Sequence, residues 1–315
     1  MNIVSSEKFN YWFINENVIM FQRKNRLNFL NGDVLKIASN TVNTWQKERK
    51  HKEVVRDTVQ GKIAEDMFED LILLLQSEYD IRYLSYDNFR NDHFKKHAPI
   101  DGILYESSNT IMDSGIAKIL KEVSSNEYGR ISTETREFLN KNKLYTVEIK
   151  SSRVPDKDYE EIDLDNFKNK EQQLNIIEKL RKRDFLTYPR YTRLLGMKVH
   201  NFTEYCEYVK RKIVEFSDLE CEELESTIIS KEIEIKSDIY TRIFMDWNNT
   251  ESVIGYLTGY ALKEDFFETP RVINMFRRGK SENALYFVCP IRKTRGVEEI
   301  VCDDRLWCHL QKKLE

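Results

Sequence analysis

The sequence predicts an α/β protein, and three observations lead to this class. Segments with helical periodicity alternate with segments in which apolar and polar residues alternate as they do in strands. Hydrophobic residues make up 40% of the 315 residues and charged residues 33%, so the chain is able to bury a sizeable core. Only 10 Gly and 5 Pro are present, which predicts few long loops and no obvious linker. We therefore expect one elaborated α/β domain.

The N-terminal part predicts short strands followed by helices. Residues 1–30 mix aromatic and charged side chains and predict one or two short strands. Helical periodicity runs over 33–50 and is clearer over 62–75, where apolar residues recur on one stripe. At about 100° per residue, Glu65 falls just beyond the edge of this stripe, whereas Asp70 projects further toward solvent. Glu65 is thus the acid of this helix that is best placed to reach under the core.

The rest of the chain alternates between the two periodicities. Helical segments are expected within 107–131, and over 132–143, 165–183 and 203–216. Strand-like segments lie at 100–105, 144–150, part of 184–196, 232–247, 251–262 and 284–292. The segment 144–150 alternates strictly, so Glu148 and Lys150 share one face of the strand and Val147 and Ile149 share the other.

Asp101, Glu148 and Lys150 form the set of residues that indicates chemistry. Two carboxylates on neighbouring strands can hold a hard divalent cation such as Mg²⁺, which prefers oxygen ligands. Such a cation neutralises a phosphate and lowers the pKa of a bound water. Lys150 lies two positions beyond Glu148 on the same strand face, where an ammonium can orient an attacking water or stabilise a transition state.

This set resembles the signature of the PD-(D/E)XK nuclease superfamily. The matching residues are Pro99-Ile100-Asp101 and Glu148-Ile149-Lys150, and the helix with Glu65 is similar to the first core helix of that fold. The resemblance implies that Asp101, Glu148 and the Ile149 carbonyl are metal ligands and that Lys150 is the catalytic lysine. It also implies that Glu65 joins the site through water.

The resemblance implies a restriction-endonuclease-like core, a mixed sheet flanked by helices, over about 58–200. Residues 201–315 would then be a large C-terminal elaboration. The match itself covers about 58–106 and 144–153, a minority of the chain. Asp101 and Glu148 are separated by 47 positions, a long connection between neighbouring strands. Residues 107–143 must therefore be an insertion with its own helices if the two carboxylates are to meet.

The function that this resemblance favours is Mg²⁺-dependent hydrolysis of double-stranded DNA to 5′-phosphate and 3′-hydroxyl ends, with Mn²⁺ as a possible substitute. A type II restriction endonuclease fits a chain of this size, and a homodimer would match a palindromic site. A cognate DNA methyltransferase is then an expected partner. Two alternatives stay open. One is a structure-specific nuclease for repair, recombination, transposition or phage defence, and the other is an inactive DNA-binding protein of this fold.

A second Glu-Ile-Lys-Ser, at 234–237, provides an internal comparison. It has the same alternation as 148–151, but no Pro-x-Asp strand and no helical acid precede it in a similar order. We therefore expect Lys236 to be structural. This comparison matters because an isolated Glu-x-Lys on a strand is usually only solvated charge.

DNA contacts would need local basic patches, because the net charge is −3. Six basic residues and one acidic residue lie between Arg181 and Lys198, with tyrosines interleaved. A solvated helix and loop would explain this segment equally well. The residues that we consider for phosphate contact are Arg153, Arg181, Lys182, Arg183, Arg190 and Arg193.

Other motifs carry little functional signal. The five cysteines are dispersed without a Cys-x-x-Cys pair, so we expect reduced, mostly buried thiols. His93 and His97 have zinc-like spacing but lack further ligands, so surface histidines are expected. No apolar run approaches the length of a membrane span, and the N-terminus does not resemble a secretory signal. We therefore expect a cytoplasmic protein.

Overall fold

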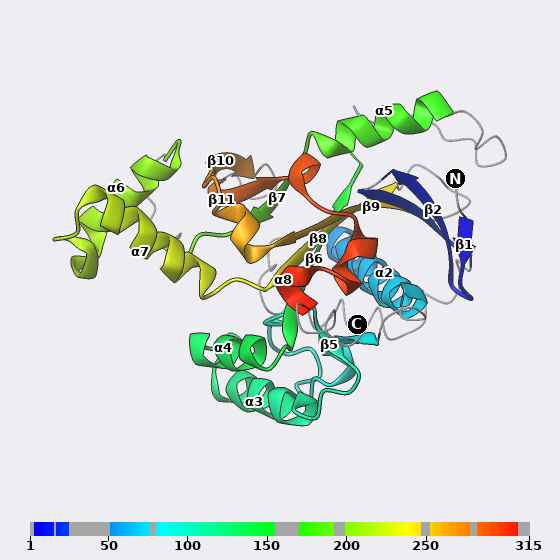
Figure 1. The fold of residues 1–315 in the computed structure, drawn as a ribbon, viewed down its shortest axis with the longest axis horizontal. Helices are drawn as coiled ribbons and strands as arrows, with labels where there is room; N and C mark the ends of the chain where they lie inside the picture. The colour runs from blue at the N-terminus through cyan, green and yellow to red at the C-terminus, as the bar shows by residue number, and fades with distance from the viewer. Residues whose placement is uncertain are drawn as a thin grey trace.

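A computed structural model describes residues 3–15, 17–24, 51–75, 80–154, 170–191, 199–246, 253–277 and 282–307. These residues form an α/β arrangement with a large mixed sheet, a smaller sheet and flanking helices (Figure 1). The α/β class expected from the sequence is confirmed. Within these ranges, no helix has both the length and the apolar character that crossing a membrane would require.

The large sheet has eight strands in the order β1-β2-β3-β9-β8-β6-β5-β4. Neighbouring strands are antiparallel, except that β6 and β8 pair in parallel at the centre of the sheet. The strands are β1 Ile3–Ser5, β2 Phe9–Asn15, β3 Val18–Arg23, β4 Ile81–Ser85, β5 Gly102–Glu106, β6 Tyr145–Arg153, β8 Ile239–Asp246 and β9 Val253–Leu262.

The smaller sheet joins segments from two parts of the chain. Its order is β10-β11-β7, and both pairings are antiparallel. The strands are β7 Asp184–Thr187, β10 Val272–Arg277 and β11 Glu282–Pro290. This sheet lies beside the central strands, so β7 comes close to the middle of the large sheet (Figure 1).

Helices and short 3₁₀ turns connect and cover these strands. The helices are α2 His51–Leu75, α3 Met112–Ser125, α4 Thr133–Lys141, α5 Lys170–Arg181, α6 Phe202–Lys212, α7 Cys221–Ile233 and α8 Asp304–Trp307. The 3₁₀ turns are η2 Tyr86–Asn88, η5 Val214–Phe216, η6 Lys263–Phe266, η8 Ile291–Lys293 and η9 Val297–Val301.

Helix α2 covers one face of the large sheet. Its apolar stripe, which includes Ile63, Met67 and Phe68, is buried against Val147 and Ile149 of β6. Each large apolar side chain buried in this way contributes roughly 1.5–3 kcal/mol relative to its exposed state. The helix begins at His51, upstream of the predicted 62–75, because the preceding turns are polar and carry little periodic signal. Packing along the sheet therefore fixes the position of Glu65 on α2.

A second core covers the opposite face. There, residues of α5, α6, α7 and the smaller sheet pack against Tyr240 and Phe244 of β8. A third, smaller core lies under α3 and α4, which Figure 1 shows together at the lower edge beside β5. These two helices occupy the segment between β5 and β6, so the long connection does not separate the two strands.

The structure confirms several predicted elements and corrects others. The helix expected at 132–143 is α4 with Ser132 as its N-cap, and 251–262 is a strand as expected. Within 1–30, where one or two strands were expected, the described residues 3–15 and 17–24 form three. The prediction that 232–247 is one strand is wrong, because α7 extends to Ile233 and β8 starts only at Ile239. The helix predicted at 33–50 lies outside the described residues.

Two predictions about side-chain exposure also need correction. Asp70 does not project to solvent: it is buried and accepts a hydrogen bond from Tyr11 Oη at 2.7 Å. Among the described cysteines, Cys206 and Cys289 are buried and Cys221 and Cys302 are exposed, and all four are free thiols. His93 and His97 are both exposed, as expected for surface histidines.

Candidate functional site

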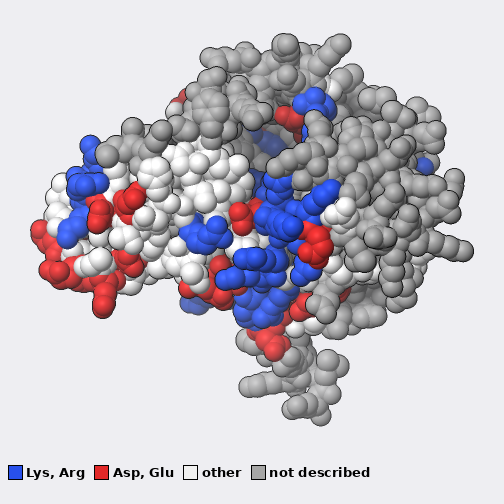
Figure 2. Space-filling model, turned by 90° about the horizontal axis from the view of Figure 1, so that it is seen from above, with Lys and Arg blue, Asp and Glu red and all other residues white. Residues whose placement is uncertain are grey.

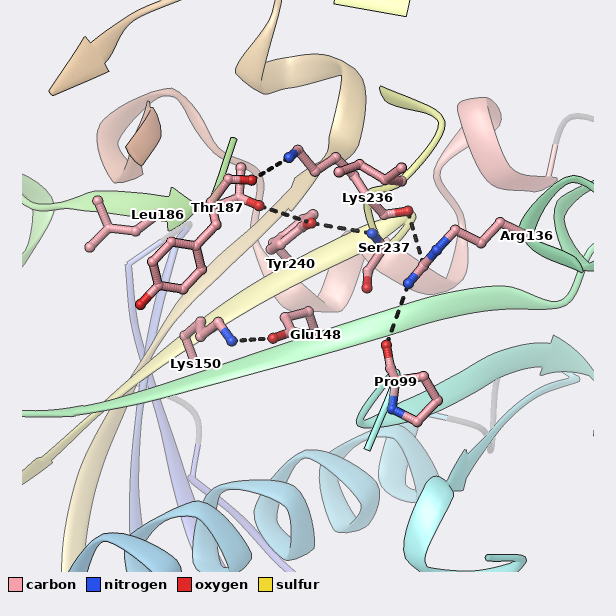
Figure 3. Close-up of a pocket in the computed structure, with 11 residues that line it drawn as sticks. Pro99, Arg136, Glu148, Lys150, Leu186, Thr187, Lys236, Ser237 and Tyr240 are labelled. Carbon is pink, nitrogen blue, oxygen red and sulfur yellow. Dashed lines mark hydrogen bonds and ion pairs between the residues drawn. The ribbon is translucent and has the colours of Figure 1, made fainter. Parts of the chain in front are cut away.

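Strand β6 presents Glu148 and Lys150 on the face of the sheet opposite α2. The alternation predicted for 144–150 is observed, since Val147 and Ile149 point into the α2 core. The Glu148 and Lys150 side chains are 23% and 45% exposed, and the Lys150 Nζ and a Glu148 carboxylate oxygen form an ion pair. Figure 3 shows both side chains on the side of the ribbon that faces Tyr240. These two polar residues therefore lie beside each other at an accessible place.

Asp101 lies directly next to this pair. Its backbone N–H donates to the Val147 carbonyl at 3.0 Å, and its Oδ2 accepts a hydrogen bond from the Ile149 N–H at 2.5 Å. Antiparallel pairing of β5 with β6 begins one residue later, at Gly102 opposite Val147. Asp101 thus lies immediately before the first residue of β5 and beside β6, and the structure brings Asp101 and Glu148 together despite their separation in sequence.

The backbone around Asp101 is held by two tyrosines. The Tyr83 hydroxyl donates to the Asp101 carbonyl at 3.1 Å, and the Tyr86 N–H donates to the same oxygen at 2.9 Å. Tyr83 packs edge-to-face on Phe68 of α2, with ring centroids 5.1 Å apart. The helix, β4 and the start of β5 therefore fix the direction of the Asp101 side chain.

Glu65 approaches Asp101 from the α2 face of the sheet. Its carboxylate accepts a hydrogen bond from Lys62 Nζ at 2.6 Å, and Lys62 also pairs with Asp87. Burial raises the pKa of Glu65 to about 6, because it outweighs the opposing charge of Lys62. Glu65 is therefore near Asp101, but across the sheet from Glu148 and Lys150.

The charges of these residues act on one another. Burial raises the pKa of Asp101 well above its ordinary value, and the negative charges of Glu148 and Glu65 raise it further. Desolvation would lower the pKa of Lys150, but the charges of Glu148 and Asp101 outweigh it and hold the pKa above its usual range. The carboxylates beside the charged lysine repel one another, and a bound cation would reduce this repulsion.

Three oxygen donors converge where β5 begins, and together they could hold a hard cation. They are the carboxylates of Asp101 and Glu148 and the Ile149 carbonyl, which faces the same side of β6 as the Ile149 N–H. In the described part of the chain, no three or more His, Cys, Asp or Glu side chains form a group able to hold a metal. A site here would therefore depend on the backbone carbonyl and on waters, which Mg²⁺ retains readily.

A cavity of about 150 Å³ opens beside Glu148 and Lys150. Figure 3 shows it bounded by β6 and β8 on one side and by β7 and the segment that follows α7 on the other. Tyr240 forms part of its wall, and Arg136 donates to the carbonyls of Lys236 and Pro99 at its edge. The cavity gives a substrate access to the polar pair from the side of the small sheet.

Lys236 lines the same cavity but is engaged within the protein. Its side chain is 3% exposed, and its Nζ donates to Glu232 at 2.9 Å and to the Tyr188 carbonyl at 2.5 Å. Burial lowers the pKa of Lys236, although the Glu232 charge opposes this shift. The second Glu-Ile-Lys is therefore not a strand motif, and its lysine has a buried carboxylate partner that fits the structural role expected for it.

The basic residues considered for DNA contact are in different surroundings. Lys182 is exposed and Arg183 half-buried, Arg181 pairs with Glu178 at 3.0 Å, and Arg193 lies outside the described residues. Arg190 is bound to α7 through the Lys231 carbonyl and Glu234. Arg153 is exposed at the end of β6, where alternation places it on the α2 face, away from Glu148 and Lys150.

The sequence reasoning missed two residues near the site, Tyr240 and Arg242 of β8. In the parallel register Glu148 lies opposite Tyr240, and Lys150 lies opposite Arg242. A signal was present in the sequence, because Arg242 is the one charged residue between Ile239 and Met245. It could not be interpreted without knowing which strand pairs with 144–150.

Comparison of the chain with models of known protein families, with curated proteins and with solved structures found no match. The resemblance to the PD-(D/E)XK nucleases therefore depends on the residues named above and on their geometry alone.

Proposed function

We propose that this protein is a Mg²⁺-dependent DNA endonuclease with a restriction-endonuclease-like fold, of the type II restriction class. The hydrogen bond from the Ile149 N–H to Asp101 Oδ2 carries this proposal, because it joins the two halves of the motif at one point. The mixed sheet with helices on both faces and the helices between β5 and β6 support the same assignment. Mn²⁺ would substitute for Mg²⁺, since it accepts the same oxygen ligands.

In this proposal the residues of the chain have separate tasks. Asp101, Glu148 and the Ile149 carbonyl would hold the cation, which when bound would supply Lewis acidity and neutralise charge on the phosphate. Lys150 stays protonated, orients the attacking water and stabilises the negative charge that develops on the phosphate oxygens. Water adds to phosphorus and gives up one proton to solvent, the P–O3′ bond breaks, and O3′ takes up one proton from solvent, so that 5′-phosphate and 3′-hydroxyl ends result. Glu65 lies near Asp101 on the α2 face of the sheet, and from there it positions a water molecule.

The biological setting follows from the type II assignment. A palindromic recognition site would be read by a homodimer, in which each subunit cuts one strand. A DNA methyltransferase of the same specificity would protect the host's own sites, and the protein would act in the cytoplasm.

The test is incubation of the purified full-length protein with plasmid DNA in Mg²⁺, Mn²⁺, Ca²⁺ or EDTA, followed by sequencing of the ends. We expect cleavage in Mg²⁺ and Mn²⁺ only, at one short sequence, with 5′-phosphate ends. Asp101→Ala, Glu148→Ala and Lys150→Ala should each lower the cleavage rate at least about a hundredfold, because each removes a ligand or a charge at the reacting phosphate. Circular dichroism should show that the variants remain folded.

Other outcomes would separate the alternatives. Cleavage at junctions or flaps, independent of sequence, would indicate a structure-specific nuclease of the same chemistry. Binding of duplex DNA in Ca²⁺ without cutting in Mg²⁺ by fresh protein would indicate an inactive DNA-binding protein. Full activity of the Asp101→Ala variant would refute the proposed site.

A further inference from the structure

Arg242 of β8 lies beside the candidate site, one strand away from Lys150. The two residues are opposite each other in the parallel register, so their side chains project from the same face of the sheet, on strands about 4.8 Å apart. Arg242 donates from Nη2 to Ser152 Oγ at 3.1 Å and from Nη1 to the Asp184 carbonyl. The guanidinium therefore lies between β6 and the start of β7, next to the row formed by Glu148 and Lys150.

The guanidinium of Arg242 contacts the Phe244 ring, with Cζ 4.7 Å from the ring centroid, but its charge has no carboxylate partner in the described part of the chain. Within the same ranges, its shielded Nε has no hydrogen-bond partner. Burial, together with the positive charge of Arg183, lowers the pKa of Arg242 to about 10 against the weaker opposing effect of Asp184. A partly buried arginine of this kind is costly unless an anion completes its hydrogen bonds.

More basic residues surround the same place. Asp184 is half-buried among Arg271, Arg242 and Arg292, whose charges act on its carboxylate. Arg183 adds a further cation, and both Arg271 and Arg292 are exposed. The carboxylate of Asp184 is therefore surrounded by three guanidinium groups. Viewed from above Figure 1, the side that carries α5 and the small sheet shows Lys and Arg gathered in one area (Figure 2).

We propose that Arg242 binds a backbone phosphate of duplex DNA next to the phosphate that is cut, and that Arg183, Arg271 and Arg292 extend this contact along the same strand. The inference rests on the proposed function. It adds Arg242 as a phosphate-binding residue and a path of basic residues along which the DNA strand would lie. The planar fork of the arginine guanidinium suits bidentate binding of phosphate. DNA binding would depend on such local basic contacts, because the net charge of the whole chain is −3. The path leads from the cavity at Lys150 to the exposed basic surface.

The experiment measures binding of a short fluorescein-labelled DNA duplex to the full-length protein in Ca²⁺, by anisotropy over a series of salt concentrations. Arg242→Gln should weaken binding about tenfold and reduce the slope of log affinity against log salt by about one, because one phosphate contact is lost. Arg242→Lys should keep the slope. Arg211→Gln, which changes an exposed cation on α6, should behave as wild type.

A purely structural role of Arg242, in which it only supports β7 through the Asp184 carbonyl, predicts the opposite pattern. The Arg242→Gln variant would then have a lower melting temperature but unchanged affinity and salt slope, and this result would overturn the inference. If Arg242→Gln does not fold, Arg271→Gln combined with Arg292→Gln tests the exposed part of the path, and unchanged affinity would refute it.

The outcomes also separate this inference from the proposed function. Wild-type protein that cuts DNA, together with an Arg242→Gln variant that binds like wild type, would refute the inference alone. Wild-type protein that neither binds nor cuts DNA would refute both.

Discussion

At the scale of single residues, the two Glu-Ile-Lys tripeptides show how position decides chemistry. Lys150 projects from a strand, is 45% exposed and pairs with a neighbouring carboxylate at the cavity. Lys236 follows a helix end, is 3% exposed and holds the fully buried Glu232. The same three letters therefore give an accessible cation in one case and an internal ion pair in the other.

This difference predicts opposite effects of the same substitution. Lys236→Ala should lower the free energy of unfolding by about 3–5 kcal/mol, because it leaves the Glu232 charge buried without its cation. The folded fraction should still cut DNA. Lys150→Ala should change stability by less than about 1 kcal/mol and abolish cutting. Urea denaturation and a plasmid assay on both variants provide the check, and loss of cutting only with Lys236→Ala would mean that Lys236 is the catalytic lysine.

The site was more predictable than its surroundings, for a physical reason. Glu148 and Lys150 are linked by a local rule, since strand alternation puts residues two apart on one face, and Asp101 was assigned through the short Pro-Ile-Asp motif. Arg242 reaches the site only because β8 pairs with β6, and that pairing is a long-range property of the sheet. Similarly, Glu65 was expected from the helix stripe, but its pairing with Lys62 and its place across the sheet from Glu148 depend on tertiary packing.

At the scale of elements, the start of β5 depends on a close approach at Gly102. A Cβ atom there would lie 2.4 Å from the Tyr83 ring, and this ring packs on α2 while its hydroxyl holds the Asp101 carbonyl. The contact between β4, β5 and α2 thus leaves no room for a side chain, and the orientation of Asp101 depends on it.

We expect Gly102→Ala to lower the free energy of unfolding by about 1–3 kcal/mol, because Tyr83 must move. Cleavage should fall as well, since the support of Asp101 is displaced. Gly61→Ala is the matched control, because no atom lies within 4 Å of the added Cβ in the interior of α2. This control should raise stability by about 1 kcal/mol and leave cleavage unchanged. Guanidinium denaturation of both variants measures the difference, and equal effects would contradict it.

Elements with strong periodicity were predicted well, and those set by packing were not. The strict alternation of 144–150 and the Ser132 cap before α4 are local signals, and both are observed. The segment 232–238 alternates like a strand. Ile228 and Glu232 are nevertheless buried on α7, and the helix therefore continues to Ile233. Local alternation therefore could not distinguish a helix end from a strand there.

At the scale of the whole molecule, Asp303 ties the C-terminal segment to the large sheet. It accepts a hydrogen bond from Tyr260 of β9 at 2.7 Å and pairs with Arg295 and Arg305 at 3.1 and 3.0 Å. Nearby, Trp307 packs edge-to-face on Tyr145 at the start of β6, with ring centroids 5.1 Å apart. The last described residues thus support the strand that carries Glu148 and Lys150.

The pKa of Asp303 gives this connection a pH dependence. Burial alone would raise it, but hydrogen bonds from Arg305 and Tyr260 outweigh burial and hold the pKa below 3.8, its ordinary value. A carboxyl group with a lowered pKa in the folded state stabilises the fold above its unfolded pKa, and this contribution is lost as pH falls through the folded pKa. Asp303→Asn should therefore cost about 3–5 kcal/mol near neutral pH, and the difference from wild type should shrink below pH 3.8.

Denaturant unfolding at several pH values measures this difference. A penalty for Asp303→Asn that stays constant down to strongly acidic pH would contradict the ionised state assigned to Asp303. Asp304→Asn, at the neighbouring exposed position, serves as the control and should show only a small change.

The parallel pairing of β6 with β8 has a consequence for how the protein becomes active. Glu148, Lys150 and Arg242 belong to two strands that come together only after the chain from 154 to 238 has emerged and folded back. Closing such a large loop is slow, because its entropy is lost before the contacts form. Under the proposed function, a nascent chain would leave nucleic acid intact until its central strands join, and activity would appear only when folding is complete.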